Sequence, residues 1–236
     1  MGGGALLFPR AFDKTLILLF LVAGFLTGCA GGQLALDTQP KAKPDVVVLG
    51  ADGLPALDDL MKAGPLGDKW LGKQTAPVTV IEYMSLTCPH CRVFHTNTFP
   101  QFKRHFIDTG KVRYIVREFP IGRSAGNAAI VTRCGKKDRT FRLIDLFLMQ
   151  QKRWVSQEVR LDAIYGVAKQ SGLSRAEFDQ CLKDQALIDG LQWVKDRGRK
   201  LGVSGTPTFF INGKKVRKPL KFEELKGLIN AQLQAS

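Results

Sequence analysis

The feature that most constrains this chain is a pair of cysteines directly after an apolar, β-branched run. Val78–Met84 reads Val-Thr-Val-Ile-Glu-Tyr-Met, a composition that predicts a strand buried on both faces. Cys88-Pro89-His90-Cys91 follows it, and Pro89 suits the first turn of a helix because its fixed φ fits that turn and no N–H is needed there. A C-x-x-C pair at the junction of a strand and a helix is typical of a redox dithiol.

The position of the motif predicts different chemistry for its two sulfurs. Cys88 would lie at the helix start, where unpaired backbone N–H groups and the helix dipole favour a thiolate, so we expect it to be the nucleophile. Cys91 would lie one turn further in as the resolving thiol, and a protonated His90 would add positive charge near Cys88. Because a stabilised thiolate favours the reduced form, the disulfide becomes a stronger oxidant. A pKa lowered by about three units corresponds to roughly 4 kcal/mol, which is on the order of 90 mV for a two-electron couple.

The rest of the chain mixes strand and helix patterns, which predicts an α/β fold. A phenylalanine-rich helix after the motif should kink at Pro100 and end at Gly110. Asn212-Gly213 favours a type I′ hairpin turn. The further predicted segments are strands at 111–117, 208–211 and 214–216, and helices at 124–134, 138–151, 157–171, 174–183, 186–201 and 222–233.

The N-terminus has the form of an export signal. A positively charged start precedes the apolar run 15–26, which is shorter than the roughly 20 residues that a membrane-spanning helix needs. The run ends in Leu-Thr-Gly-Cys29, which resembles the bacterial lipobox, in which the cysteine is lipidated and becomes the first mature residue. We therefore interpret residues 1–28 as a lipoprotein-type signal peptide; simple cleavage after Ala30 and a retained anchor are the alternatives. Either cleavage predicts a periplasmic or other extracytoplasmic location, where disulfides persist.

Residues 29–65 are predicted to be a tether or linker, because their prolines interrupt any long element, with a short helix near 57–62. The chain carries a net charge of +14 at pH 7. Such a charge attracts nucleic acid or anionic lipid weakly, but no helix-turn-helix, RRM or zinc-finger pattern accompanies it. We interpret the charge as a basic solvated surface and expect no nucleic-acid partner.

Two segments resemble DsbA, a bacterial periplasmic thiol oxidant. Residues 82–91, Glu-Tyr-Met-Ser-Leu-Thr-Cys-Pro-His-Cys, are similar to its active-site segment. Residues 205–209, Gly-Thr-Pro-Thr-Phe, are similar to the loop that places a cis-proline opposite the dithiol in thioredoxin-fold proteins. The resemblance implies an α/β thioredoxin fold interrupted by an inserted α-helical domain, whereas thioredoxin itself lacks the insertion. The implied parts are 66–121 and 191–236 for the thioredoxin fold and 122–190 for the insertion.

The same resemblance assigns the substrate-binding loop. Pro207 would be the cis-proline, and Thr206 would turn its backbone outward to pair with an extended substrate peptide. The familiar enterobacterial form of DsbA has Val at this position, so Thr206 departs from it and leaves the redox potential open. An ordinary trans turn at Pro207 is the alternative.

A carboxyl group lies within the predicted central strand. In DsbA-like proteins a buried acid six residues before the first cysteine assists proton transfer to or from the second cysteine, and Glu82 matches that position relative to Cys88. Burial would raise the pKa of Glu82 and suit it to that task. The alternative is a Glu82 at a strand edge that reaches water.

Two more cysteines lie in the helical block. Outside the cytoplasm, Cys134 and Cys181 favour a structural disulfide over two separate buried thiols. The cysteine motif together with His95 also offers possible metal ligands. Because His90 would point away from the helix start and the compartment favours a disulfide, no metal is expected.

Together these features predict a thiol:disulfide oxidoreductase that introduces disulfide bonds into exported proteins. The redox-active Cys88–Cys91 disulfide would serve without another cofactor, and reduced exported polypeptides would be the substrates. The resemblance implies a DsbB-type membrane protein as reoxidant, and a lipid at Cys29 would be the only membrane contact. Two alternatives stay open: an extracytoplasmic reductase or isomerase, and a non-enzymatic lipoprotein that binds metal or peptide.

Overall fold

The computed structural model describes residues 55–135 and 139–235. The predicted signal peptide, Cys29 and most of the predicted tether lie outside these residues. Among the helices of the described ranges, none combines the length and the apolar character needed to cross a bilayer.

The described residues form a five-stranded mixed sheet, and the predicted α/β class is confirmed. The order is β1-β3-β2-β4-β5, in which β2 and β3 run parallel and the other neighbours run antiparallel. Strand β2, which leads to the cysteine motif, is therefore central, with a partner on each side. The strands are β1 (Lys69–Leu71), β2 (Val78–Met84), β3 (Val112–Glu118), β4 (Thr208–Ile211) and β5 (Lys214–Val216).

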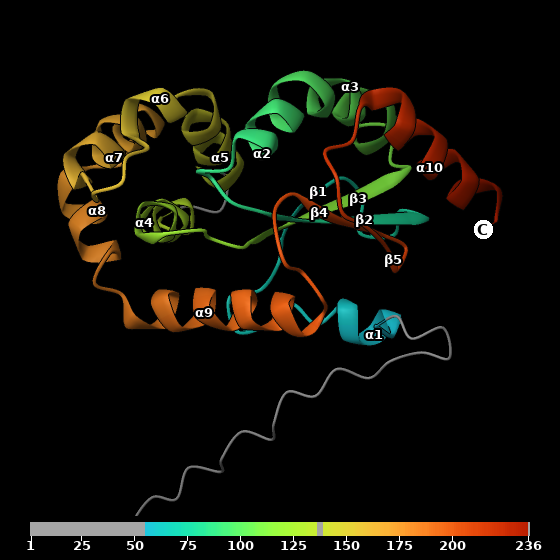
Figure 1. The fold of residues 1–236 in the computed structure, drawn as a ribbon, viewed down its shortest axis with the longest axis horizontal. Coiled ribbons are helices and arrows are strands. Elements are labelled where there is room, and N and C mark those ends of the chain that lie inside the picture. Colours follow the sequence, from blue (N-terminus) through green and yellow to red (C-terminus); the bar gives the residue numbers. More distant parts are fainter. Residues whose placement is uncertain (1–54, 136–138, 236) are drawn as a thin grey trace, which may run out of the picture. The chain divides into compact units, whose positions relative to one another are not determined.

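Helices cover both faces of the sheet (Figure 1). One face carries α1 (Leu57–Leu60) and α9 (Gln185–Lys200). The opposite face carries α2 (Pro89–Val93), α3 (Phe99–Phe102) and α10 (Phe222–Gln234). The remaining helices form the block at the left of Figure 1: α4 (Arg123–Thr132), α5 (Arg139–Met149), α6 (Gln151–Trp154), α7 (Leu161–Ala168) with the 3-10 turn Lys169–Ser171, and α8 (Arg175–Cys181).

Strand β2 is buried on both faces, as its composition predicted. Val80 and Met84 belong to the larger apolar core, which continues into the helical block. Ile81 and Tyr83 belong to a separate core under α1 and α9. This two-sided burial follows from the period-two alternation of strand side chains, and it holds the residues after β2 in a fixed position.

The helix after the cysteine motif does not keep a regular α pattern. Between α2 and α3 lies the π-helical segment Phe94–Thr98, and a second one, Lys103–Ile107, follows α3. The N–H of Phe99 donates to the carbonyl of Phe94, five residues earlier. Because Pro100 in the first turn of α3 lacks an N–H, the disturbance predicted there takes the form of a π-helical turn directly before it.

One local prediction is confirmed, one strand was not predicted, and one predicted helix is divided in the structure. The type I′ turn is confirmed, because Asn212 and Gly213 both have positive φ, 43° and 90°, and they join β4 to β5. Strand β1 was missed: its three residues are too short to show an alternation, and pairing with β3 decides their conformation. The helix predicted at 138–151 also divides, because α5 ends at Met149 and α6 begins at Gln151.

The disulfide predicted in the helical block is present between Cys134 and Cys181. It joins the end of α4 to the last residue of α8, and the two Cα atoms are 5.9 Å apart. The crosslink restricts the unfolded chain by closing a loop with a sequence separation of 47.

We expect the double variant Cys134→Ala/Cys181→Ala to lose about 2–4 kcal/mol of unfolding free energy, because the unfolded chain regains the freedom of that loop. Denaturant unfolding of the oxidised wild type and the variant measures this difference. The reactivity of Cys88 should not change, which serves as the internal control. Equal stability of the two proteins would contradict a stabilising role.

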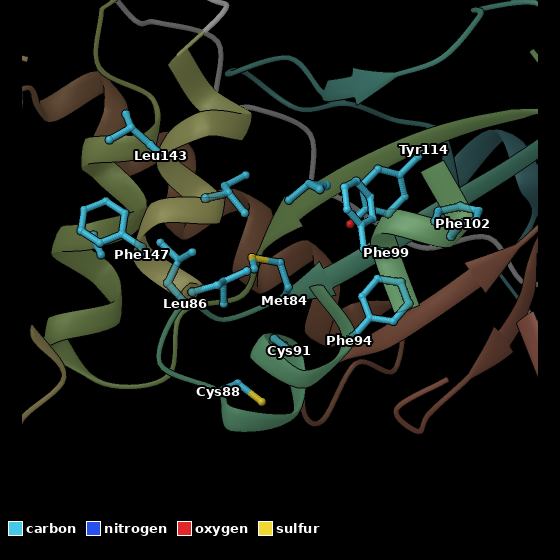
Figure 2. Packing of buried hydrophobic residues seen from close by; sticks show 14 of the residues in the cluster. Met84, Leu86, Cys88, Cys91, Phe94, Phe99, Phe102, Tyr114, Leu143 and Phe147 are labelled. Carbon is cyan, nitrogen blue, oxygen red and sulfur yellow. The ribbon is translucent and has the colours of Figure 1, made fainter. Parts of the chain in front are cut away.

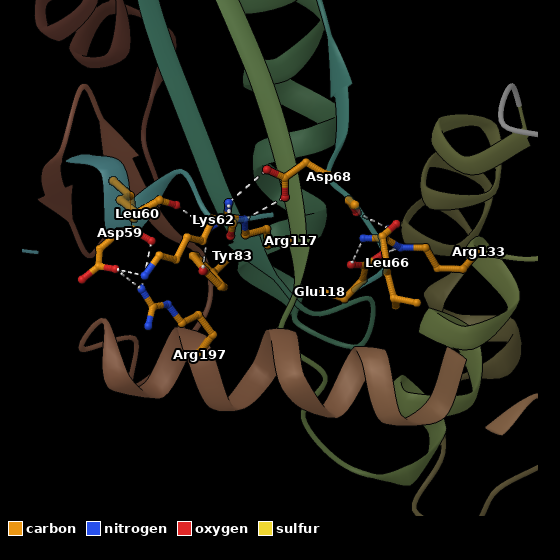
Figure 3. A network of polar contacts seen from close by, with 11 residues as sticks. Asp59, Leu60, Lys62, Leu66, Asp68, Tyr83, Arg117, Glu118, Arg133 and Arg197 are labelled. Atoms are coloured by element: carbon orange, nitrogen blue, oxygen red, sulfur yellow. Dashed lines mark hydrogen bonds and ion pairs between the residues drawn. The ribbon is translucent and has the colours of Figure 1, made fainter. Parts of the chain in front are cut away.

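Three arginine–carboxylate ion pairs in the described part of the chain have both side chains buried (Figure 3). Arg117 on β3 contacts both carboxylate oxygens of Asp68, at 2.9 and 3.0 Å, and donates also to the carbonyls of Leu60 and Lys62. Two further pairs, Arg133–Glu118 and Arg197–Asp59, have shortest distances of 2.6 and 2.9 Å. The Arg117 and Arg197 pairs fasten the segment before β2 to the sheet and to α9.

Replacing Arg117 by Met should destabilise the fold by about 3–5 kcal/mol, because the carboxylate of Asp68 would stay buried without its cation. The matched variant Arg199→Met breaks a pair with Asp196 whose side chains are 55% and 46% exposed, and it should change stability by less than about 1 kcal/mol. Urea denaturation of both variants measures the contrast. Equal losses would refute this assignment.

Candidate active site

The first cysteine lies at the start of α2. Cys88 is the N-cap residue, with an extended backbone at φ −75° and ψ 122°, and Pro89 follows in the first turn. The backbone N–H of Cys88 donates to the carbonyl of Ser85 at 3.0 Å, which closes the turn after β2. Figure 2 shows Cys88 at this helix start and Cys91 one turn further in. Both cysteines are present as free thiols.

The pKa of Cys88 is lowered from its ordinary value of 9.0 to about 5. The main cause is hydrogen bonding from the Cys91 thiol; Thr206 and the backbone N–H groups of Cys91 and His90 contribute further, while burial opposes the shift. His90 thus acts through its backbone N–H, and its imidazole, which the sequence suggested as a source of charge, is exposed. The thiolate depends on donors that the helix start supplies.

Cys91 has the opposite environment. Its side chain is fully buried, and its pKa is raised well above the ordinary value. Burial is the largest cause, followed by the hydrogen bond to Cys88 and the charge of Glu82. One sulfur of the pair is therefore ready to react as an anion, and the other holds its proton.

The loop before β4 lies against the reactive sulfur. The Thr206–Pro207 peptide bond is cis, as predicted. Cys88 Sγ lies 3.2 Å from the carbonyl oxygen of Thr206, although 118 residues separate them. The two predicted segments thus form one site.

Glu82 is fully buried, so the alternative in which it reaches water at a strand edge is wrong. The reason is the central position of β2, with β3 and β4 on its two sides. Glu82 Oε2 lies 3.1 Å from His95 Nε2, and it also accepts a hydrogen bond from the Tyr114 hydroxyl. A buried acid beside Cys91 therefore has two specific polar partners.

Sequence reasoning missed three residues of this site. The spacing from Cys91 placed His95 on the same helical face, but it suggested only a metal ligand. Tyr114 pairs with Val80 in the register of β2 and β3, and the sequence alone does not specify that register. Gln151 in α6 donates to the carbonyls of Leu86 and Cys88 at 2.7 and 3.0 Å, and no sequence signal pointed to it.

Other side chains around the motif set its access to solvent. Pro89 and His90 are exposed, and Val93 on the same helix is 42% exposed.

Within the described ranges, no group of three or more His, Cys, Asp or Glu side chains is arranged to hold a metal ion.

A thioredoxin family model matches residues 66–231. The chain belongs to the thioredoxin family. The crystal structure of α-DsbA1 from Wolbachia pipientis is 30% identical, with a TM-score of 0.70, and the match covers 76% of this chain and 97% of that one. This likeness confirms the predicted resemblance to DsbA and the thioredoxin fold with helices inserted.

Other relatives extend the comparison. A protein of Rickettsia conorii named putative protein-disulfide oxidoreductase is 35% identical over 151 residues, which cover 62% of this chain and 53% of that protein. The chain thus spans about half the length of the curated relatives it matches first. Oxidised BdbD from Bacillus subtilis is 23% identical with a TM-score of 0.67, covers 80% of this chain and 99% of that one, and shares the fold. The predicted boundaries at 121, 190 and 191 stay predictions.

We expect alkylation of Cys88 by iodoacetamide to follow a titration with a midpoint at about 5, because the thiolate is the nucleophile. Below the midpoint the rate should rise about tenfold per pH unit, and above it the rate should level off. In a Cys91→Ala variant the loss of the thiol donor should move the midpoint upward. A wild-type midpoint near 9.0, the ordinary value, would contradict this site.

The same pKa sets a pH dependence of stability. Because the pKa of Cys88 is lower in the folded protein, its thiolate stabilises the reduced fold fully above the ordinary value of 9.0. This contribution should be lost as the pH falls through about 5. Unfolding of the reduced protein and of Cys88→Ser between these limits measures it.

Proposed function

We propose that this protein is a thiol:disulfide oxidoreductase that introduces disulfide bonds into exported proteins. The observation that carries the proposal is the contrast between Cys88, whose pKa is lowered to about 5, and the buried Cys91, whose pKa is raised. A dithiol of this kind favours its reduced form, so its disulfide passes readily to other thiols. The names of the Rickettsia and Wolbachia relatives support this reading.

The exchange begins from the Cys88–Cys91 disulfide. A substrate thiolate attacks Cys88 Sγ, the bond between the two cysteines breaks, and the electron pair passes to Cys91 Sγ, which then takes a proton. A second substrate thiolate attacks the substrate sulfur of the mixed disulfide, so Cys88 leaves as a thiolate and the substrate carries a new disulfide. The two electrons from the substrate remain in the Cys88–Cys91 dithiol, and no other cofactor is required.

Thr206 and Pro207 are proposed to bind the substrate peptide. The loop that contains them leads into β4 and lies against Cys88 Sγ. An extended peptide that pairs with the backbone of Thr206 would place its cysteine next to that sulfur, as in other strand-addition contacts. Pro89 and His90, which follow Cys88 in the chain, are exposed and would contact the same peptide.

Reoxidation completes the proposed cycle. A membrane protein of the DsbB type would accept the two electrons from the dithiol. A periplasmic location follows from the export signal, and lipidation of Cys29 would hold the protein at the membrane. These parts rest on the sequence patterns alone.

A Cys91→Ser variant should accumulate mixed disulfides with exported proteins, because the Cys88 thiolate can attack a disulfide of such a protein and release one of its thiolates, while no Cys91 thiolate is present to displace the bound protein. Non-reducing gels and mass spectrometry of material purified from the native cell envelope measure this. The double variant Cys88→Ser/Cys91→Ser is the matched control and should trap nothing. An empty Cys91→Ser sample would argue against protein substrates.

The direction of electron flow is tested separately. Equilibration of the wild-type dithiol with glutathione should give a reduction potential less negative than about −180 mV, as expected for an oxidant. A value near about −270 mV, typical of thioredoxin, would favour the reductase alternative.

A further inference from the structure

The proposed exchange leaves a proton-transfer step without a route to solvent. Cys91 departs as a thiolate in a fully buried position and must take up a proton. Glu82 is the neighbouring acid, but it is also fully buried. To pass a proton to Cys91, Glu82 therefore needs a second group that connects it to water.

His95 lies next to Glu82 at the required distance. Its Nε2 is 3.1 Å from Glu82 Oε2 and 3.4 Å from the Tyr114 hydroxyl, which donates to the same carboxylate oxygen. The other ring nitrogen, Nδ1, is buried and has no hydrogen-bond partner among the described residues. The other oxygen of Glu82, Oε1, is likewise buried without one.

The ring of His95 is held in place by aromatic neighbours. It stacks on Phe99 with a centroid distance of 4.9 Å and an interplanar angle of 25°, and it meets Phe94 edge-on at 5.4 Å. Figure 2 shows Phe94, Phe99 and Tyr114 in this region of the core. Such packing fixes the direction of both ring nitrogens.

His95 also lines a cavity of about 370 Å³ between the active-site helix and α5. Several water molecules fit this volume, since each needs roughly 30 Å³. Lys103 and Asp145 also line the cavity, and Asp145 belongs to the exposed residues. The charged and titratable groups around His95 are thus Glu82, Tyr114, Asp145 and Lys103, with Cys91 beyond Glu82.

We propose that His95 relays protons between the buried Glu82 and this cavity during disulfide exchange at Cys91. The inference rests on the proposed function and adds a residue to it. An imidazole suits the step because one nitrogen can accept a proton while the other donates one.

During reduction of the Cys88–Cys91 disulfide, one proton passes from solvent to Cys91 in successive transfers. Protonated His95 gives a proton from Nε2 to the carboxylate oxygen Oε2 of Glu82 and becomes neutral. Glu82 gives a proton to the Cys91 thiolate and is a carboxylate again. Water in the cavity then reprotonates His95, so one proton from solvent is consumed for each Cys91 thiol formed. During reoxidation every transfer runs in reverse.

The test compares His95→Gln with wild type in reduction of the Cys88–Cys91 disulfide by dithiothreitol between pH 5 and 8. The glutamine can keep a hydrogen bond to Glu82 but cannot relay a proton. We expect at least a tenfold slower reduction, within the range of general acid–base effects, a changed pH profile and an unchanged reduction potential. His105→Gln, at an exposed histidine against Phe222, is the matched control and should react like wild type.

Chemical rescue separates a relay from a purely structural role. In His95→Ala the space left by the ring joins the cavity, so added imidazole should enter and restore much of the lost rate, while it leaves wild type unaffected. Circular dichroism verifies that each variant is folded. A His95→Gln protein with wild-type kinetics, or slow folded variants that imidazole does not restore, would overturn the relay. A wild-type protein that fails to react with dithiothreitol would instead overturn the proposed function.

Discussion

The site depends on stabilising a thiolate at Cys88, at the start of α2, while Cys91, one turn further along the helix, stays protonated. Cys88 receives hydrogen bonds from Cys91 and from backbone N–H groups, which lower its pKa to about 5. The pKa of Cys91 is raised because the side chain is buried and because the negative charge of Glu82 lies nearby. Both environments come from one structural fact: a buried central strand leads directly into a helix, so that Cys88 lies among the backbone N–H groups of the helix start and Cys91 lies one turn further into the core.

The helical block does more than enlarge the molecule. Gln151 extends from α6 and donates to the carbonyls of Leu86 and Cys88, so the block helps to hold the turn that carries the reactive sulfur. The Cys134–Cys181 disulfide joins two helices of the same block. On the other face of the sheet, Arg117 and Arg197 tie down the segment that precedes β2.

Burial of a carboxylate in the middle of a sheet needs specific partners, because a buried charge without them is strongly disfavoured. Glu82 has His95 and Tyr114, one from the active-site helix and one from β3. These partners also lead away from the dithiol towards a cavity. A structural requirement and a route for protons therefore coincide in the same side chains.

The local chemistry of this protein follows from short stretches of its sequence. The strand, the Cys88–Cys91 motif, the Asn212-Gly213 turn and most helices follow from patterns within a few residues, because propensity, capping and alternation act locally. The cis bond at Pro207 was also predicted, although through family resemblance rather than local pattern.

The identity of the distant groups around the two sulfurs depends instead on how the helices and strands pack against one another. The pairing of β1 with β3, the register that brings Tyr114 to Glu82, and the reach of Gln151 depend on contacts between separate elements. Even the burial of Glu82 was undecided until β2 had a neighbour on each side. The physical reason is that burial and hydrogen bonding at these positions depend on how separate helices and strands pack together. Short-range patterns in the sequence do not specify that packing.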